Sequence, residues 1–184
     1  MENLPNHALR SSGRATELDN VRGMKTETPT GRRSVLLPEG ALPARVIVCE
    51  RTGRWAVALR RELAGAGVRI RETRSLAECW EMLAESPGGF VVVELSAVHV
   101  DALLRQMTRL ERDFPLARVA IVADRSLAHY EWLLREAGAV HFTTSTGRLG
   151  PVAQLACRHL AEAPSPPRTA KQEIWARLPW GDDE

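Results

Sequence analysis

Two glutamates stand at the ends of apolar runs, where a carboxylate could do chemistry. Glu50 follows residues 45–49 (RVIVC), and Glu94 is the charged residue of residues 90–95 (FVVVEL). Open α/β proteins place their sites where the carboxyl ends of parallel strands meet. If these two strands are neighbours, the carboxylates lie close together. They could then hold a divalent cation through oxygen ligands, or Arg51 or another basic side chain could neutralise them, which is the simpler interpretation.

The sequence offers few other chemical motifs. No two cysteines have the CxxC spacing of a zinc or redox site, and no histidine has metal-ligand spacing with a cysteine or carboxylate. Residues 50–54 (ERTGR) hold a single glycine and lack a phosphate-binding loop pattern. No nucleophile-elbow sequence is present. We therefore expect no catalytic residue and no cofactor from the histidines and cysteines, which are His7, His99, His129, His141, His159, Cys49, Cys79 and Cys157.

The elements that must position these residues alternate regularly along the chain. Short β-branched runs are separated by segments with apolar residues at helical spacing. The continuously apolar run at 90–95 is typical of a central parallel strand covered on both faces. The pattern predicts an α/β protein with a five-stranded parallel sheet between two helical layers. Its strands are expected at 45–49, 68–72, 90–95, 118–123 and 140–144, and its helices at 53–66, 75–86, 100–113, 126–137 and 149–161.

This order of elements, from Arg45 to about Ala163, resembles the receiver domain of two-component response regulators. Residues 89–94 (GFVVVE) resemble the receiver strand that ends in the phosphorylated aspartate. Asp101 stands near the position of a recurrent aspartate that precedes the third helix, and residues 137–139 (AGA) resemble the turn after the fourth helix. The resemblance implies a flavodoxin-like (βα)5 three-layer sandwich.

The departures from the receiver pattern fall on its phosphoacceptor pocket. Glu94 stands in place of the aspartate, and Glu50 is the one acid after the first strand where receivers have two. Ala123 replaces a Ser or Thr, and Ser145 and Thr146 replace a Lys-Pro pair. Phosphotransfer needs a magnesium-bridged carboxylate nucleophile beside a cation. We therefore predict a degenerate pocket in which Glu94 is either a fixed mimic of a phosphorylated residue or a polar strand end without a special role.

The aromatic residues near the end of the chain are candidates for protein binding. After the proline-rich residues 164–167, the chain carries four large apolar side chains, and tryptophan is enriched at binding hot spots. This segment is expected either to dock on another protein or to fold back on its own domain. The four side chains are Ile174, Trp175, Leu178 and Trp180.

The fourth predicted helix offers a second candidate surface. Tyr130, Leu133 and Leu134 are expected to point inward, and Trp132 falls off their stripe. Trp132 is therefore either exposed or partly buried against a neighbouring helix. Receivers commonly use the fourth helix and fifth strand to bind partners, so the resemblance makes Tyr130 and Trp132 candidate contact residues.

Composition and charge limit the classes of function. The chain has 184 residues, of which 44% are hydrophobic and 26% charged, and its net charge of +2 argues against a dedicated nucleic-acid binder. No apolar stretch reaches membrane-spanning length, and no secretory signal is visible. We expect a cytoplasmic protein with a leader over 1–43, a receiver-like domain over 44–163, and a linker and peptide over 164–184.

These observations favour a non-catalytic receiver-like signalling or scaffolding module that acts by protein–protein interaction. Direct nucleic-acid or membrane partners are not expected, and a homodimer is left open. Two alternatives stand beside this interpretation. One is a response regulator that accepts phosphate in an atypical pocket, and the other is a flavodoxin-like nucleotide-binding protein or enzyme.

Overall fold

A five-stranded parallel sheet forms the centre of the fold, in the order β2-β1-β3-β4-β5. The computed structural model describes residues 37 and 41–165. The strands are short, and their β-branched residues are well suited to a pleated surface that is covered on both faces. They comprise β1 (Val46–Cys49), β2 (Ile70–Thr73), β3 (Phe90–Leu95), β4 (Arg118–Ala123) and β5 (His141–Thr143).

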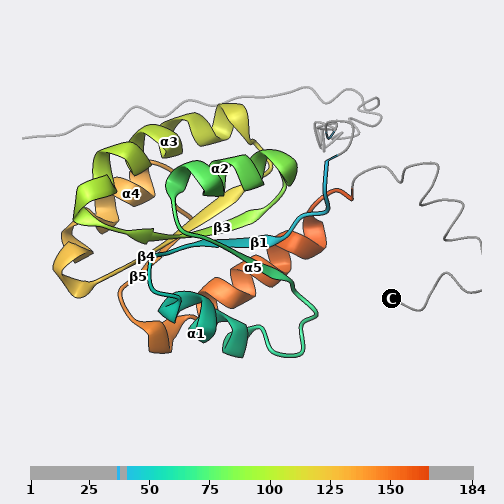
Figure 1. The fold of residues 1–184 in the computed structure, drawn as a ribbon, viewed down its shortest axis with the longest axis horizontal. Helices are drawn as coiled ribbons and strands as arrows, with labels where there is room; N and C mark the ends of the chain where they lie inside the picture. Colours follow the sequence, from blue (N-terminus) through green and yellow to red (C-terminus); the bar gives the residue numbers. More distant parts are fainter. Residues whose placement is uncertain (1–36, 38–40, 166–184) are drawn as a thin grey trace, which may run out of the picture. The chain divides into compact units, whose positions relative to one another are not determined.

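Helices cover both faces of this sheet, with α1 and α5 on one face and α2, α3 and α4 on the other (Figure 1). This arrangement confirms the predicted α/β three-layer sandwich with a flavodoxin-like fold. The strand order reverses between β1 and β3, because the chain builds outward to β2 first and to β4 and β5 afterwards. The helices are α1 (Arg54–Glu62), α2 (Leu76–Glu85), α3 (Val100–Asp113), α4 (Glu131–Glu136) and α5 (Gly150–Glu162).

The two faces of the sheet carry separate hydrophobic cores, because alternate side chains of each strand point to opposite faces. Trp55 and Leu59 of α1 pack against one face, where both are almost fully buried. Leu103 of α3 and Leu134 of α4 are buried against the other. Strand β3 contributes to both cores, and each of its residues except Glu94 is buried, as its apolar run predicts.

Local capping explains where two of the helices begin. The Ser75 hydroxyl accepts a hydrogen bond from the backbone N–H of Glu78, at 3.2 Å, and Glu78 reaches back to the N–H of Arg74, at 2.9 Å. This resembles a capping box, in which the glutamate side chain accepts from the N–H of the N-cap residue. Here Glu78 accepts instead from Arg74, the residue before the N-cap. Helix α1 begins after Gly53, whose φ of 84° lies in the left-handed region that favours glycine.

Several predicted boundaries need correction. The helix expected over 126–137 is a 3₁₀ segment at Arg125–Tyr130 followed by the single short helix α4. Leu133 is 39% exposed, so its predicted inward orientation is wrong. The tighter turn of a 3₁₀ segment changes the phase of the residues that follow it, so a uniform helical stripe misplaces Leu133. The predicted end of the first helix is also too late, because α1 stops at Glu62.

The described residues also include part of the predicted leader. The backbone N–H of Leu42 donates to the carbonyl of Glu85 at 2.7 Å, and the Ser86 hydroxyl donates to the carbonyl of Pro43 at 2.8 Å. Residues 42 and 43 therefore lie against the end of α2. The division of the chain at 43/44 and 163/164 stays a prediction.

Candidate functional site

Glu50 and Glu94 lie at the edge of the sheet where β1 and β3 end, as the adjacency of these strands requires. Glu50 is 2% exposed, and its carboxylate accepts hydrogen bonds from two backbone N–H groups of α1. The distances are 2.9 Å to Trp55 N and 2.6 Å to Ala56 N. The first N–H groups of a helix have no partner within the helix and favour negative charge. Glu50 therefore acts as the cap of α1, and both of its oxygens are engaged.

The Glu94 carboxylate receives three hydrogen bonds from α1 and the loop before it. One Glu94 oxygen accepts from the backbone N–H of Arg51 at 2.9 Å. The other accepts from the Arg54 guanidinium at 3.1 Å and from the indole N–H of Trp55 at 3.2 Å. Trp55 thus donates to Glu50 through its backbone and to Glu94 through its ring. Glu94 is held as an acceptor by groups of this chain.

The Arg54 guanidinium bridges two carboxylates from different strands. The same nitrogen that contacts Glu94 lies 2.9 Å from a carboxylate oxygen of Asp124, the residue after β4. The hydrogen bond to Asp124 is the main cause that raises the pKa of Arg54, and the charge of Glu94 adds to it. The guanidinium also lies 5.0 Å from the ring centroid of Trp55, within the range of a cation–π contact. Arg54 therefore stays charged and acts as a fixed cation of this site.

This geometry shows which cation neutralises Glu94, whereas Glu50 is bound by backbone N–H groups of α1. Arg54 forms the ion pair with Glu94, whereas Arg51 contributes its backbone N–H. Within residues 37 and 41–165, no group of three or more His, Cys, Asp or Glu side chains is arranged to hold a metal ion. A divalent cation at Glu94 would compete with the guanidinium of Arg54 for the same carboxylate.

Two cavities meet at this edge of the sheet, and both are lined by Arg51 and Glu94. One, of about 540 Å³, also contacts Arg54 and Asp124 and opens toward β4. The other, of about 460 Å³, also contacts Glu50 and lies on the side of α2 and α3. Glu50 and Glu94 thus line a common cavity, as their positions at adjacent strand ends predict.

The two other predicted pocket residues do not line either of these cavities. Ala123 is fully buried at the end of β4, within the core covered by α2, α3 and α4. Ser145 is half-buried and precedes the 3₁₀ segment at Thr146–Arg148. Its backbone N–H donates to the Thr143 hydroxyl at 3.3 Å. Neither residue offers a hydroxyl or a charge to Glu94.

The candidate protein-binding residues of α4 differ in their exposure. Trp132 is 73% exposed, so of the two alternatives for this side chain, exposed or partly buried, the exposed one is correct. Tyr130 is half-buried against the core, and its ring lies 4.2 Å from that of His129. Leu133 joins Trp132 as a partly exposed apolar side chain on the same short helix. The four candidates of the C-terminal peptide, Ile174, Trp175, Leu178 and Trp180, lie outside the described residues.

Arg54 is the site residue that sequence inspection missed. A signal for it was present, because Arg54 is the first residue of α1, where a basic side chain opposes the helix dipole. Such a residue needs a compensating acid, and here Glu94 and Asp124 supply it. The identity of those acids depends on strands that are 40 and 70 residues away in the sequence.

The chain matches no family model and no curated protein. Its fold is similar to that of a response regulator from Thermotoga maritima, which is 19% identical, with a TM-score of 0.51 over 66% of this chain and 100% of that one. A CheY-like protein (tadZ) from Pseudomonas aeruginosa PAO1 is also 19% identical, with a TM-score of 0.52 over 63% of this chain and 98% of that one. The orphan response regulator HP1043 of H. pylori is 17% identical, with a TM-score of 0.51 over 67% and 99% of the two chains. The described part of this chain therefore has the fold of CheY-like receiver domains, and none of its helices could cross a membrane.

Proposed function

We propose that the chain is a receiver-like signalling or scaffolding module that acts by binding other proteins and is not switched by phosphorylation. The receiver-like fold of the three solved structures supports a signalling role. The proposal that the chain is not switched by phosphorylation rests on the Arg54 bridge between Glu94 and Asp124.

A receiver that accepts phosphate needs a free carboxylate nucleophile and an acidic pocket open to magnesium. By the receiver resemblance, Glu94 occupies the acceptor position and Glu50 the metal-binding position. Both carboxylates are engaged by donors of this chain, and Arg54 supplies the positive charge that magnesium would otherwise supply. The site is thus neutralised from within, and this favours a state that is independent of a phosphodonor.

The exposed side chains of α4 support a role in protein binding. A tryptophan that is 73% exposed leaves a large apolar area in contact with water. Tryptophan at the centre of an interface can carry much of the binding free energy. We assign Trp132 and Leu133 as the core of the binding surface, with Tyr130 at its border and the C-terminal peptide as a second docking element.

The proposal is tested by incubating the full chain with acetyl phosphate and magnesium and measuring its intact mass. A typical receiver treated in parallel is the positive control. We expect no phosphoryl adduct on this chain and a clear adduct on the control. A reproducible adduct that disappears in the Glu94→Gln variant would instead identify an atypical phosphoaccepting response regulator and overturn the proposal.

The binding half of the proposal has its own experiment. The full chain, a chain that ends at Ala163 and a full-length Trp132→Ala variant are used as bait in co-purification from the native host. A protein retained by the full chain and lost from one or both variants supports the corresponding docking element. If all three baits retain the same proteins, neither α4 nor the C-terminal peptide is the binding element.

A further inference from the structure

The cavity on the α2 and α3 side of the sheet has the size and position of a small-molecule site. Its volume of about 460 Å³ falls within the range of about 300–1,000 Å³ that is usual for ligand pockets. It lies outside the carboxyl ends of β1 and β3, between the 3₁₀ segment that precedes α3 and the residues that begin α2. The phosphoacceptor-like contacts among Arg54, Glu94 and Asp124 face the other cavity.

The topology of the sheet places this cavity at the point where the strand order reverses. The strand order reverses between β1 and β3, and the two connections that leave these strands run to opposite faces of the sheet. A crevice forms at such a switch point, and open α/β proteins bind their ligands there. The cavity is built from both sides of this crevice, by Cys49 and Arg51 after β1 and by Glu94 and Ser96 around the end of β3.

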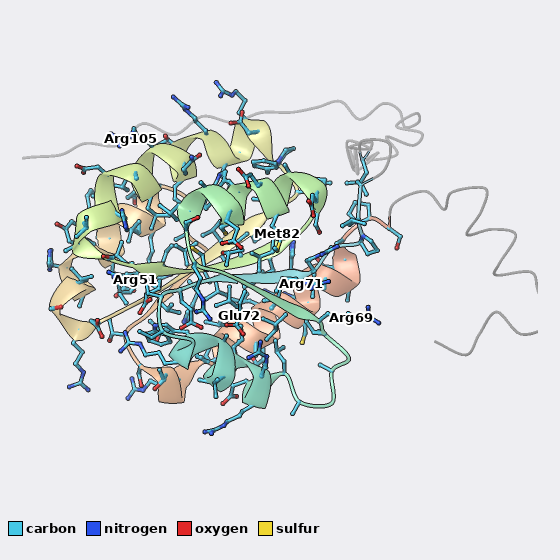
Figure 2. All side chains as sticks on the ribbon, viewed as in Figure 1. Arg51, Arg69, Arg71, Glu72, Met82 and Arg105 are labelled. Atoms are coloured by element: carbon cyan, nitrogen blue, oxygen red, sulfur yellow. The ribbon has the colours of Figure 1, made fainter. Side chains whose placement is uncertain are left out.

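One part of the cavity wall favours an anion. Arg51 has an exposed side chain that forms no ion pair within the described part of the chain, and in Figure 2 it lies at the edge of the sheet where the strands end. Arg74 contacts the Glu50 carbonyl at 3.2 Å and Glu72 at 3.2 Å, which places its guanidinium at the rim. His99, Ser75 and Ser96 complete this polar wall with further hydrogen-bonding groups.

The two carboxylates in the cavity have partners other than the Arg51 side chain. Glu50 is buried and bound to two N–H groups of α1, and Glu94 is paired with Arg54. Neither carboxylate therefore forms an ion pair with the Arg51 guanidinium. Among the described residues, the Arg51 guanidinium at the wall has no ion-pair partner, whereas Arg74 is paired with Glu72.

The remaining wall is apolar. Val93 and Leu103 are almost fully buried at the floor, and Leu76 and Ala102 flank it from α2 and α3. A ligand that satisfies both walls has an apolar body and a charged head group, since arginine donates strongly to carboxylates and phosphates. We propose that this cavity binds a small organic anion with an apolar body, of the size of a metabolite. This inference goes beyond the proposed function, because protein binding and the absence of phosphorylation stand without it.

The experiment uses two fluorescent probes that share one apolar body. 1-Anilinonaphthalene-8-sulfonate carries an anionic sulfonate, and N-phenyl-1-naphthylamine is the same body without it. We expect the full chain to bind the anionic probe saturably and about tenfold more tightly than the neutral one, which is the value of one charge-assisted hydrogen bond of about 1.4 kcal/mol. Equal affinity for the two probes, or no saturable binding of the anionic probe, would overturn the proposal.

Two pairs of variants locate the binding site. Arg51→Ala removes the unpaired guanidinium, and Arg105→Ala removes an exposed arginine of α3 that does not line the cavity (Figure 2). Ala102→Trp fills the cavity, and Ala84→Trp adds the same bulk at an exposed position of α2. We expect Arg51→Ala to weaken the anionic probe about fivefold to tenfold without affecting the neutral one, and Ala102→Trp to weaken both. Probe binding that is the same in each variant and its control contradicts this location.

Competition identifies the head group. AMP and benzoate, each added against bound anionic probe, present a phosphate and a carboxylate on an aromatic body. Displacement by AMP but not by adenosine assigns a phosphate, and displacement by benzoate but not by benzyl alcohol assigns a carboxylate. If neither anion displaces the probe more effectively than its neutral partner, the assignment of an anion site is wrong.

Discussion

At the scale of single residues, the most informative feature is Arg54, whose guanidinium lies between the carboxylates of Glu94 and Asp124. Arg54 stands in the first turn of α1, which is unfavourable for a positive charge by itself. Its two carboxylate partners and the ring of Trp55 compensate for this placement. The pair with Glu94 is better shielded than the pair with Asp124, because Glu94 has 12% of its side chain exposed and Asp124 has 63%.

Removing Arg54 is expected to convert this site into a weak divalent-metal site. Arg54→Ala leaves Glu94 and Asp124 without their cation, and two neighbouring carboxylates favour magnesium or calcium. The variant itself should lose about 1 kcal/mol of unfolding free energy, as a partly exposed pair does. Added magnesium should then raise the thermal midpoint of the variant and leave the wild type unchanged.

Arg60→Ala is the matched control for this experiment, because it breaks an ion pair with Glu72 of β2 and does not involve Glu94 or Asp124. Its thermal midpoint should not respond to magnesium. If the wild type responds as strongly as Arg54→Ala, then Arg54 does not occupy the cation position.

Glu50 should contribute more to the free energy of unfolding than an exposed glutamate at the start of a helix does. Glu50→Gln keeps the shape of the side chain but replaces one of two acceptor oxygens with a donor, which then faces a backbone N–H of α1. We expect a loss of about 2 kcal/mol in the free energy of unfolding, measured by urea denaturation. Glu78→Gln, at the exposed start of α2, should lose about 0.5 kcal/mol. Equal losses in the two variants would contradict the role of Glu50 as a buried cap.

At the scale of elements, the segment between β4 and β5 departs most from a regular helix. Six residues form a 3₁₀ segment, and α4 adds six more. The segment buries Leu134 and leaves Trp132 in solvent. A short helix with one buried anchor and a large exposed aromatic side chain is suited to present a surface to a partner.

This division of labour within α4 can be measured. Leu134→Ala should lower the free energy of unfolding by about 2–5 kcal/mol, because it empties a fully buried position. Trp132→Ala should change it by less than about 0.5 kcal/mol, as is usual for exposed positions. Both values come from the same urea titrations. A loss for Trp132→Ala that approaches that of Leu134→Ala would mean that the tryptophan is packed and not available to a partner.

At the scale of the whole molecule, His159 makes stability depend on pH. Its Nε2 lies 2.9 Å from the carbonyl oxygen of Gly88, and its ring lies 5.8 Å from that of Phe90, so it joins α5 to the start of β3. Burial lowers the pKa of His159, and burial also lowers that of His141. The folded state therefore favours the neutral ring of each histidine.

The sign of the effect follows from proton uptake on unfolding. Below the ordinary histidine pKa of about 6.5, the unfolded chain binds protons that the folded chain resists. The stability contributed by the neutral rings is fully present above the unfolded-state pKa. It is lost as the pH falls through the lowered pKa of the folded state. His159→Gln should show a smaller decrease in the thermal midpoint on acidification than the wild type, with part of the decrease retained through His141. A wild-type midpoint that rises on acidification below neutral pH would contradict this assignment.

Much of the architecture was determined by sequence alone. The strands at 90–95 and 118–123 and the helix at 100–113 have the predicted bounds, because apolar residues at a fixed period require burial on a fixed face. The turn at residues 137–139 was likewise predicted, and Gly138 there has a left-handed φ of 101°. The adjacency of β1 and β3 was only a condition of the sequence argument, because regular alternation predicts parallel strands and leaves their order open.

Only the tertiary structure decided how the charged groups at the sheet edge are paired. Side-chain partners from β3 and β4 come together at Arg54 because the parallel strands end at one edge, and no local pattern specifies which cation reaches which acid. The exposure of Trp132 was also open until the 3₁₀ segment set the phase of α4. Local periodicity determines which residues must be buried, whereas contacts between distant segments depend on a geometry that exists only after the sheet has formed.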